Sequence, residues 1–513
     1  MIQRLGIFAR VSRDPLRSFS TRFRISHIWA VVALLTVGLC PCWAAEFRID
    51  SQETFDHLRT STFRPGDVIL FHRGSRFKGM FAPAGSGTDG NPIVVKSYGH
   101  GKRPRIDAGG KHPAGFLLQD STFWEVNGLE ITNIDGTDQD QGTLFGIYVV
   151  VTGDSKATND GIVRHIYIDD CDIHDVNGLV AGKKRGGIHV HIMNCRATRF
   201  DDLRITNNRI RRVGGVGIGN DSSCGRVVLR PGREVTENLW TNVYVAGNHV
   251  DQTGRNNVIA RCSKDAVYEF NTLANSSRFD TGHSIFCFNT DGIRIQHNEA
   301  YGNIGDDHHD RGGFDADYNC VNTFIQYNYS HDNMWFCGIM KKPNRNVTIR
   351  YNISQNEQSG LYFYGFDSSL DAENIQIYNN THYTRKGLQA VVFPENRTPL
   401  NTHFSNNIFY FEGKGRWGNS GKAINTTFHN NLYFHVPPRE TDASAILRDP
   451  RFLKPGITGT GIDLRTRKSL LGYRLIAGSP AIDRGVPVES GLQATNFFGS
   501  PIPRYSVNIG AAE

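Results

Sequence analysis

The chain has 513 residues, a formal net charge of +7, 39% hydrophobic residues and 54 glycines. A high glycine content with few long apolar runs is typical of a soluble all-β protein with many turns. The sequence has no lysine- or arginine-rich tract with interleaved aromatic residues, which argues against a nucleic-acid partner.

Residues 1–45 have the features of an export signal. Six arginines precede the apolar run IWAVVALLTVGL at 28–39, and Ala44 or Ala45 offers a small residue for cleavage. The run is shorter than the ~20 residues that span a membrane, so an uncleaved anchor is only the alternative. We therefore expect a secreted or periplasmic protein. Six arginines and one aspartate would leave with the signal, which lowers the formal charge from +7 to +2.

A motif of the form I-x-x-N-x-Φ, in which Φ is usually apolar, recurs through residues 111–435. From Asn248 onward its asparagines follow one another at intervals of 23 to 30 residues, which is typical of solenoid repeats. Apolar positions alternate with period two, which predicts strands and excludes helical repeats. An amide at one fixed position in each coil predicts a ladder of side-chain hydrogen bonds. The asparagines are Asn208, Asn248, Asn271, Asn298, Asn328, Asn352, Asn380, Asn407 and Asn431, and Cys171 takes the same position earlier in the chain.

This repeat resembles that of the right-handed parallel β-helix proteins of the pectin-lyase-like fold. FRPGDVILFHRG at 63–74 and GNPIVVKSYG at 90–99 resemble their first coils, and SPAIDRG at 479–485 and NIGAAE at 508–513 resemble their last segment. The resemblance implies N-terminal coils over 46–110, a β-helix over 111–435, a C-terminal cap over 436–513, and about eleven coils in all. It also implies a polysaccharide or oligosaccharide substrate, without fixing the reaction.

A second strand in each coil lies upstream of the asparagine, as in GIHVH at 187–191 and GFDAD at 313–317. Its first and third residues after the start are mostly small or apolar and are expected to fill the core. The second and fourth are then expected to point outward. The predicted outward column is His189 and His191, Ile259 and Arg261, Phe286 and Phe288, Asp315 and Asp317, Met340 and Lys342, Tyr362 and Tyr364, and Gln389 and Val391.

Aromatic side chains beside a carboxylate pair predict a sugar-binding groove on this face. Phe286, Phe288, Tyr362 and Tyr364 are the predicted sugar platforms, and His189 and His191 are predicted polar contacts. The alternative is that a loop covers the aromatic rings.

Asp315 and Asp317 are two residues apart on one strand, so their Cα atoms are roughly 6.6 Å apart. Two close carboxyl groups repel each other, which favours one acid and one base or nucleophile. The spacing weakly favours inversion over retention in a glycosidase. The D-x-D-x-N pattern at 315–319 leaves a calcium site open as an alternative.

The segment GDDHHD at 305–310 immediately precedes that strand. Asp306, Asp307 and Asp310 are candidate calcium ligands, and His308 and His309 are candidate substrate contacts. In the β-helix lyases that this chain resembles, a Lys or Arg acts as the base. The resemblance therefore makes Lys342 and Arg261 candidate catalytic residues.

The leading hypothesis is an exported, monomeric glycoside hydrolase that uses Asp315 and Asp317. One alternative is a calcium-dependent uronate lyase or epimerase, and another is a non-catalytic glycan-binding or cell-surface solenoid. Calcium is the only cofactor that the sequence suggests, either in the D-x-D-x-N pattern or under the lyase interpretation.

Overall fold

The computed structural model describes most of the chain downstream of residue 43. The chain divides into two compact units, Met1–Trp43 and Ala44–Glu513. No helix among the described residues is long and apolar enough to cross a membrane. The described ranges are 44–152, 160–193, 198–223, 238–305, 310–340, 343–365, 372–393, 398–418, 422–456, 459–488, 495–503 and 506–512.

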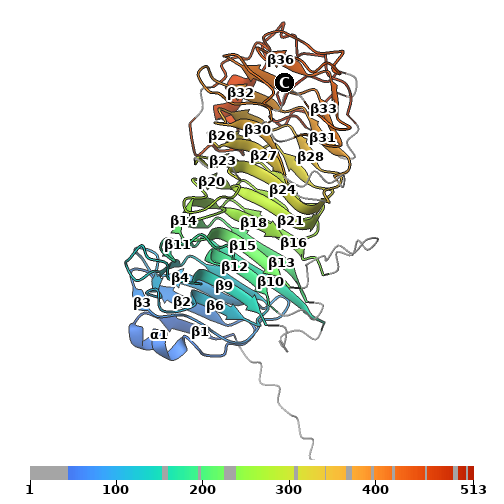
Figure 1. The fold of residues 1–513 in the computed structure, drawn as a ribbon. Coiled ribbons are helices and arrows are strands. Elements are labelled where there is room, and N and C mark those ends of the chain that lie inside the picture. Colours follow the sequence, from blue (N-terminus) through green and yellow to red (C-terminus); the bar gives the residue numbers. More distant parts are fainter. Residues whose placement is uncertain are drawn as a thin grey trace, which may run out of the picture. The chain divides into compact units, whose positions relative to one another are not determined.

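The second unit is a parallel β-helix, as predicted, because successive coils pair strand to strand in three sheets whose ladders are all parallel (Figure 1). The largest sheet has fourteen strands, three more than the eleven coils expected, because β1, β2 and β4 belong to N-terminal coils that lack the motif. The fourteen-stranded sheet contains β1 (Glu46–Ile49), β2 (Val68–His72), β4 (Ile93–Tyr98), β7 (Trp124–Asn127), β10 (Ile162–Asp169), β13 (Arg199–Thr206), β16 (Thr241–Ala246), β19 (Val267–Glu269), β22 (Arg294–Gln296), β25 (Phe324–Gln326), β28 (Thr348–Arg350), β31 (Ile375–Tyr378), β33 (Thr402–Ser405) and β35 (Thr427–His429).

The other two sheets complete each coil. The thirteen-stranded sheet contains β3 (Arg76–Lys78), β5 (Arg105–Asp107), β8 (Glu130–Asn133), β11 (Asp172–Val176), β14 (Arg209–Val213), β17 (His249–Thr253), β20 (Thr272–Ala274), β23 (Glu299–Tyr301), β26 (Tyr329–His331), β29 (Ile353–Gln355), β32 (Thr381–Thr384), β34 (Ile408–Phe411) and β36 (Leu432–Phe434). The nine-stranded sheet contains β6 (Ala114–Gln119), β9 (Phe145–Val151), β12 (Gly186–Ile192), β15 (Val216–Ser222), β18 (Val258–Arg261), β21 (Ile285–Asp291), β24 (Gly312–Val321), β27 (Trp335–Ile339) and β30 (Gly360–Tyr364).

The predicted asparagine ladder lies at the bend between the fourteen- and thirteen-stranded sheets. From Asn208 to Asn407 each side-chain amide donates to the asparagine amide oxygen of the next coil, at 2.9–3.1 Å, and Asn431 ends the ladder by donating to Asp442 Oδ2 at 2.9 Å. The residue before each of these asparagines has a left-handed backbone, for example Tyr327 with φ 56°. This bend turns the chain within two residues and leaves buried backbone groups that the amides satisfy.

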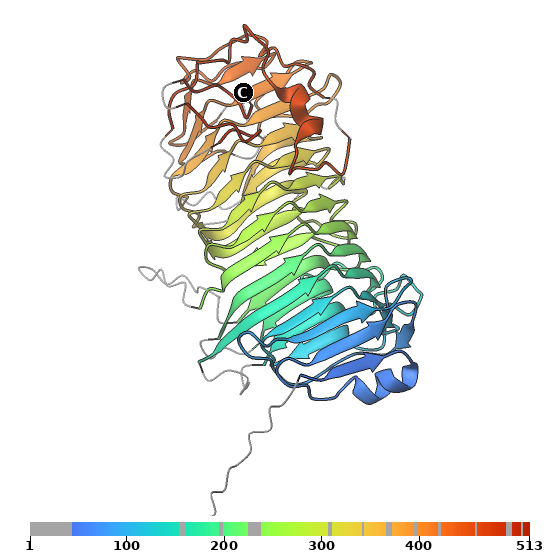
Figure 2. The ribbon, with the colours of Figure 1, turned by 180° about the vertical axis from the view of Figure 1, so that it is seen from behind.

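Two short helical elements pack on the solenoid. The helix α1 (Gln52–Leu58) begins at Ser51 with a capping box and buries Phe55 against the first coils. At the other end the 3-10 helix η1 (Lys468–Tyr473) lies beside the later coils (Figure 2). The Tyr473 hydroxyl donates to Gln355 Oε1 at 2.5 Å, so this segment covers the thirteen-stranded sheet.

Candidate active site

The outer face of the nine-stranded sheet carries two parallel rows of side chains, fixed by the strand register. One row includes Tyr148, His189, Phe286, Asp315 and Phe363, and all but Tyr148 are buried. The other runs through His191, Asp221, Arg261, Phe288 and Tyr318 and is partly exposed, apart from Asp221. The partly exposed row is therefore where a ligand would meet this face.

Asp315 lies on the covered row and is only 2% exposed. His283 Nδ1 accepts a hydrogen bond from the Gly312 N–H at 2.9 Å, so a neutral His283 carries its proton on Nε2. That nitrogen lies 3.7 Å from Asp315 Oδ2 and 3.9 Å from Asp310 Oδ1. Gly338 leaves the space for this carboxylate, because a Cβ there would lie 2.7 Å from Asp315 Oδ1. One imidazole thus links Asp315 to Asp310.

Asp317 lies at a β-bulge, where the pairing of β24 with β21 shifts by one residue between Cys287 and Phe288. Bulges re-aim side chains and are enriched beside active sites. The Asn344 amide donates to the carbonyls of Ala316 and Asp317 at 3.0 and 3.3 Å and accepts from the Cys320 N–H at 2.9 Å. One buried amide therefore holds both ends of the bulge.

The bulge also brings forward an aromatic residue that the sequence pattern missed. Tyr318 pairs with Phe288 in register, and the two rings stack with centroids 4.9 Å apart and planes 25° apart. Phe286, in contrast, is buried beneath Lys183, whose Nζ lies 4.8 Å from the ring centroid. Phe288 and Tyr318 are thus the half-exposed rings nearest to Asp317.

A charged cluster lies on the partly exposed row toward the N-terminal coils. Lys184 Nζ lies 2.6 Å from Asp221 Oδ2, and Arg261 Nη1 lies 3.7 Å from Asp221 Oδ1. Burial raises the pKa of Asp221, but the hydrogen bond from Lys184 and the nearby positive charges outweigh it, so its pKa lies below the usual range. Asp221 belongs to GIGND at 217–221, which aligns with GIHVH and could have revealed it.

The two predicted histidines differ in accessibility. The His191 ring is half-buried, and its Nδ1 lies 3.0 Å from the Tyr148 hydroxyl. Burial raises the pKa of Tyr148 to about 12. His189 is buried and stacks on Phe145, and burial together with His191 lowers its pKa to about 3, which keeps the ring neutral at pH 7.

The predicted outward placement of Tyr362 and Tyr364 is wrong. Tyr362 pairs with Cys337 and Tyr364 with Ile339, and both partners face the core. Tyr362 donates or accepts a 2.9 Å hydrogen bond with His382 Nε2, and neither tyrosine can act as a sugar platform. The run LYFY has no polar residue to mark its outer face, and the structure turns Phe363 outward instead.

Five predicted site residues lie outside the described residues: Lys342, Asp306, Asp307, His308 and His309. Asp310 is described, and its side chain is 34% exposed at the rim of the site. Within the described ranges no group of three or more His, Cys, Asp or Glu side chains is arranged to hold a metal ion. The calcium hypothesis stays a prediction.

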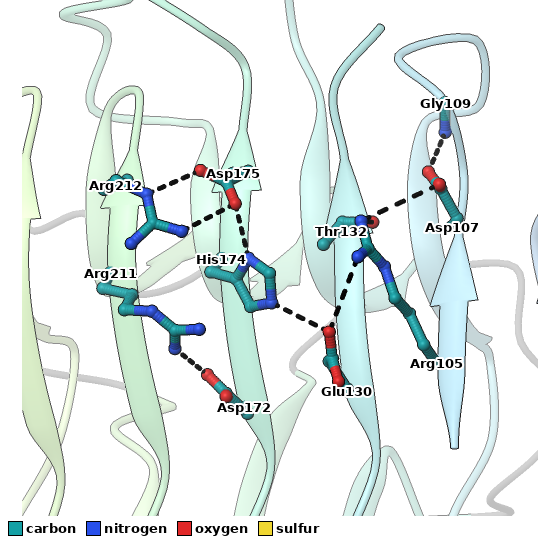
Figure 3. Close-up of polar contacts among 10 residues, drawn as sticks. All are labelled: Arg105, Asp107, Gly109, Glu130, Thr132, Asp172, His174, Asp175, Arg211 and Arg212. Atoms are coloured by element: carbon teal, nitrogen blue, oxygen red, sulfur yellow. Dashed lines mark hydrogen bonds and ion pairs between the residues drawn. The ribbon is translucent and has the colours of Figure 1, made fainter. Parts of the chain in front are cut away.

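A second polar cluster lies on the thirteen-stranded sheet (Figure 3). His174 Nδ1 lies 2.6 Å from Asp175 and its Nε2 lies 3.1 Å from Glu130, while Arg212 binds Asp175 through two nitrogens. These contacts join residues of neighbouring strands β8, β11 and β14. Each ring nitrogen of His174 has a carboxylate partner, so the network stabilises the coil stack.

No family model matches the sequence. A lacto-N-biosidase of Bifidobacterium longum is 26% identical over 531 aligned positions, which cover 84% of this chain and 32% of that protein. The chain thus spans about a third of the length of this relative.

Among solved structures, the native GH136 lacto-N-biosidase of Eubacterium ramulus superimposes with a TM-score of 0.56 at 20% identity, over 68% of this chain and 65% of that chain. The selenomethionine derivative of that protein superimposes with a TM-score of 0.58 at 19% identity, over 77% of this chain and 68% of that chain. These similarities confirm the resemblance to β-helix carbohydrate-active proteins.

Proposed function

We propose that the chain is a glycoside hydrolase that cleaves an oligosaccharide on the outer face of the nine-stranded sheet. The observation that carries the proposal is the pair Asp315 and Asp317 on one strand, with Asp317 at a bulge beside the half-exposed Phe288 and Tyr318. The sequence similarity to a lacto-N-biosidase supports hydrolysis as the reaction. The predicted signal segment supports an exported enzyme.

A glycoside hydrolase needs one carboxyl group that protonates the leaving oxygen and one carboxylate beside the sugar ring. His283 Nε2 lies 3.7 Å from Asp315 Oδ2, on the buried row. We assign Asp317, which is buried at the bulge but lies beside the partly exposed row, as the group that protonates the leaving oxygen. Asp315, with Asp310 across the same imidazole, provides the negative charge that stabilises the positive charge on the sugar ring.

The test is product analysis with p-nitrophenyl lacto-N-bioside, lacto-N-tetraose and a panel of neutral and acidic polysaccharides. Hydrolysis adds one water per bond broken and gives new reducing ends without absorbance at 235 nm. Absorbance at 235 nm would overturn the proposal in favour of a lyase.

Variants then assign the roles. We expect D317N and D315N to lose at least about 100-fold in kcat, and D310N less. The matched control is D251N on β17, because Asp251 also accepts a hydrogen bond, from Asn275, but lies on another sheet. Equal activity of D317N and D251N would remove Asp317 from the mechanism.

A further inference from the structure

The charged cluster on the partly exposed row belongs to the same face as the aspartates. Arg261 pairs in register with Phe288, and Phe288 pairs with Tyr318 beside Asp317. Neighbouring strands are ~4.8 Å apart, so the Arg261 backbone lies about 10 Å from that of Tyr318. A short oligosaccharide bound at the aspartates and running along the stack would reach Arg261.

Arg261 has a fixed backbone, yet none of the described residues accepts a hydrogen bond from its guanidinium. The side chain is 14% exposed, and its guanidinium carbon lies 5.4 and 5.8 Å from the ring centroids of Phe288 and Phe286. The Arg261 N–H and C=O bond the Asn220 amide, which fixes the backbone. Its Nε is buried with no hydrogen-bond partner among the described residues, and Nη1 is 3.7 Å from Asp221. A donor that is buried without an acceptor costs free energy.

The carboxylate beside Arg261 is shared with a second cation. Lys184 contacts Asp221 at 2.6 Å, and Lys183 Nζ lies 4.8 Å from the centroid of the Phe286 ring. Arg261, Lys184 and Asp221 together carry a formal charge of +1. His189 adds no charge, because burial keeps it neutral.

We infer that Arg261, with Lys183 and Lys184, forms a subsite for the carboxylate of an acidic sugar, so that the preferred substrates are anionic oligosaccharides. This inference rests on the proposed function, because it places the acidic sugar on the glycan that the aspartates cleave. A planar guanidinium can hold a carboxylate through two parallel hydrogen bonds, which a lysine cannot do. The rings of Phe288 and Phe286 lie beside this guanidinium, with centroids 5.4 and 5.8 Å from its carbon.

The test is calorimetric binding to the D317N protein, which prevents turnover. The probes are lacto-N-tetraose, the same tetrasaccharide with N-acetylneuraminic acid, and an uronate-containing tetrasaccharide. We expect at least one acidic probe to bind about tenfold or more tightly than the neutral one at low salt, with the advantage reduced at high salt. The two acidic probes distinguish sialic from uronic acid.

R261Q should abolish the preference for the acidic probe, and R261K should retain only part of it. R204Q is the control, because Arg204 on β13 also lies against an aromatic ring, that of Tyr167, on a different sheet. Equal affinity for neutral and acidic probes, including no binding of either, overturns the subsite, as does an R261Q variant that keeps the preference.

Hydrolysis by the unmodified chain separates the two proposals. Cleavage of neutral glycans without acidic preference would leave the hydrolase proposal standing and remove the subsite. If an acidic probe binds more tightly but no probe is cleaved, the subsite stands and the hydrolase proposal is removed.

Discussion

Replacing Asn328 by aspartate exchanges the side-chain NH2 group for an oxygen in the middle of the asparagine ladder. The Asn328 amide donates to Ile295 O at 2.9 Å and to Asn352 Oδ1 at 3.0 Å, and its oxygen accepts from the Asn298 N–H at 2.9 Å. An ionised aspartate keeps the acceptor but would point a negative oxygen at two other oxygens. The variant N328D therefore tests whether the ladder depends on the amide donors.

The expected cost depends on pH. A protonated aspartate restores one of the two donated hydrogen bonds. At pH 4 the variant is therefore expected to lose about 1 kcal/mol in free energy of unfolding. The site disfavours ionisation, so the folded-state pKa of the new acid is raised, and stability falls as pH increases above the unfolded value of ~3.9. Each pH unit costs at most ~1.4 kcal/mol, which gives a loss of up to ~5 kcal/mol at pH 7.

The assay is urea unfolding followed by circular dichroism at pH 4 and pH 7. The control is N346D in a second, exposed ladder, where the Asn346 amide donates to Asn322 Oδ1 at 3.0 Å. Water can replace the lost partner there, so we expect N346D to lose under ~1 kcal/mol at either pH. If N328D and N346D differ by less than ~1 kcal/mol at pH 7, the buried donors contribute little and the argument fails.

Three further outcomes follow from single buried contacts. Burial raises the pKa of Glu357 to about 8, above its unfolded value, so the chain should lose roughly 3 kcal/mol of stability between pH 5 and pH 8; E357Q should remove that slope in urea titrations. A methyl group at Gly338 would displace the Asp315 carboxylate, whose Oδ1 would lie 2.7 Å from it. G338A should therefore lower kcat ~100-fold with a small change in melting temperature. An unchanged kcat would contradict the placement of Asp315 in the active site. N344A and N352A should destabilise by similar amounts of ~2–4 kcal/mol, but only N344A, which frees the bulge, should lower kcat at unchanged KM; equal kcat in both would show that the bulge does not position the acid.

The sequence predicts the solenoid well because its rule is periodic. Every coil must turn at the same place, so Asn328 and its equivalents mark the bend, and alternation then places Asp315 outward and Phe314 inward. The prediction of which side chains face outward is wrong where no polar residue distinguishes the two faces of the strand, as at Tyr362. Tyr318 was missed for another reason, because a bulge adds one residue and no residue type signals it.

Side-chain contacts between neighbouring coils are less predictable. His283 lies near Asp310 and Asp315, and the motif SIFCF gives no hint that the preceding histidine turns toward the next coil. Lys184 precedes β12 and contacts Asp221 on the neighbouring strand β15 in the same way. Spacing identifies which residues share a strand face, whereas the loops decide which of them touch.

Two histidines on different sheets show why function is placed on the nine-stranded face. His174 has a carboxylate at each ring nitrogen, and its strand pairs directly with two others of the network. His189 is as deeply buried, yet its Nε2 has no hydrogen-bond partner among the described residues. Natural folds satisfy buried polar groups unless a site needs them. Among the described residues, the buried His189 Nε2 and Arg261 Nε have no hydrogen-bond partner, and both lie on the face that also carries Asp315 and Asp317, where we place the binding surface.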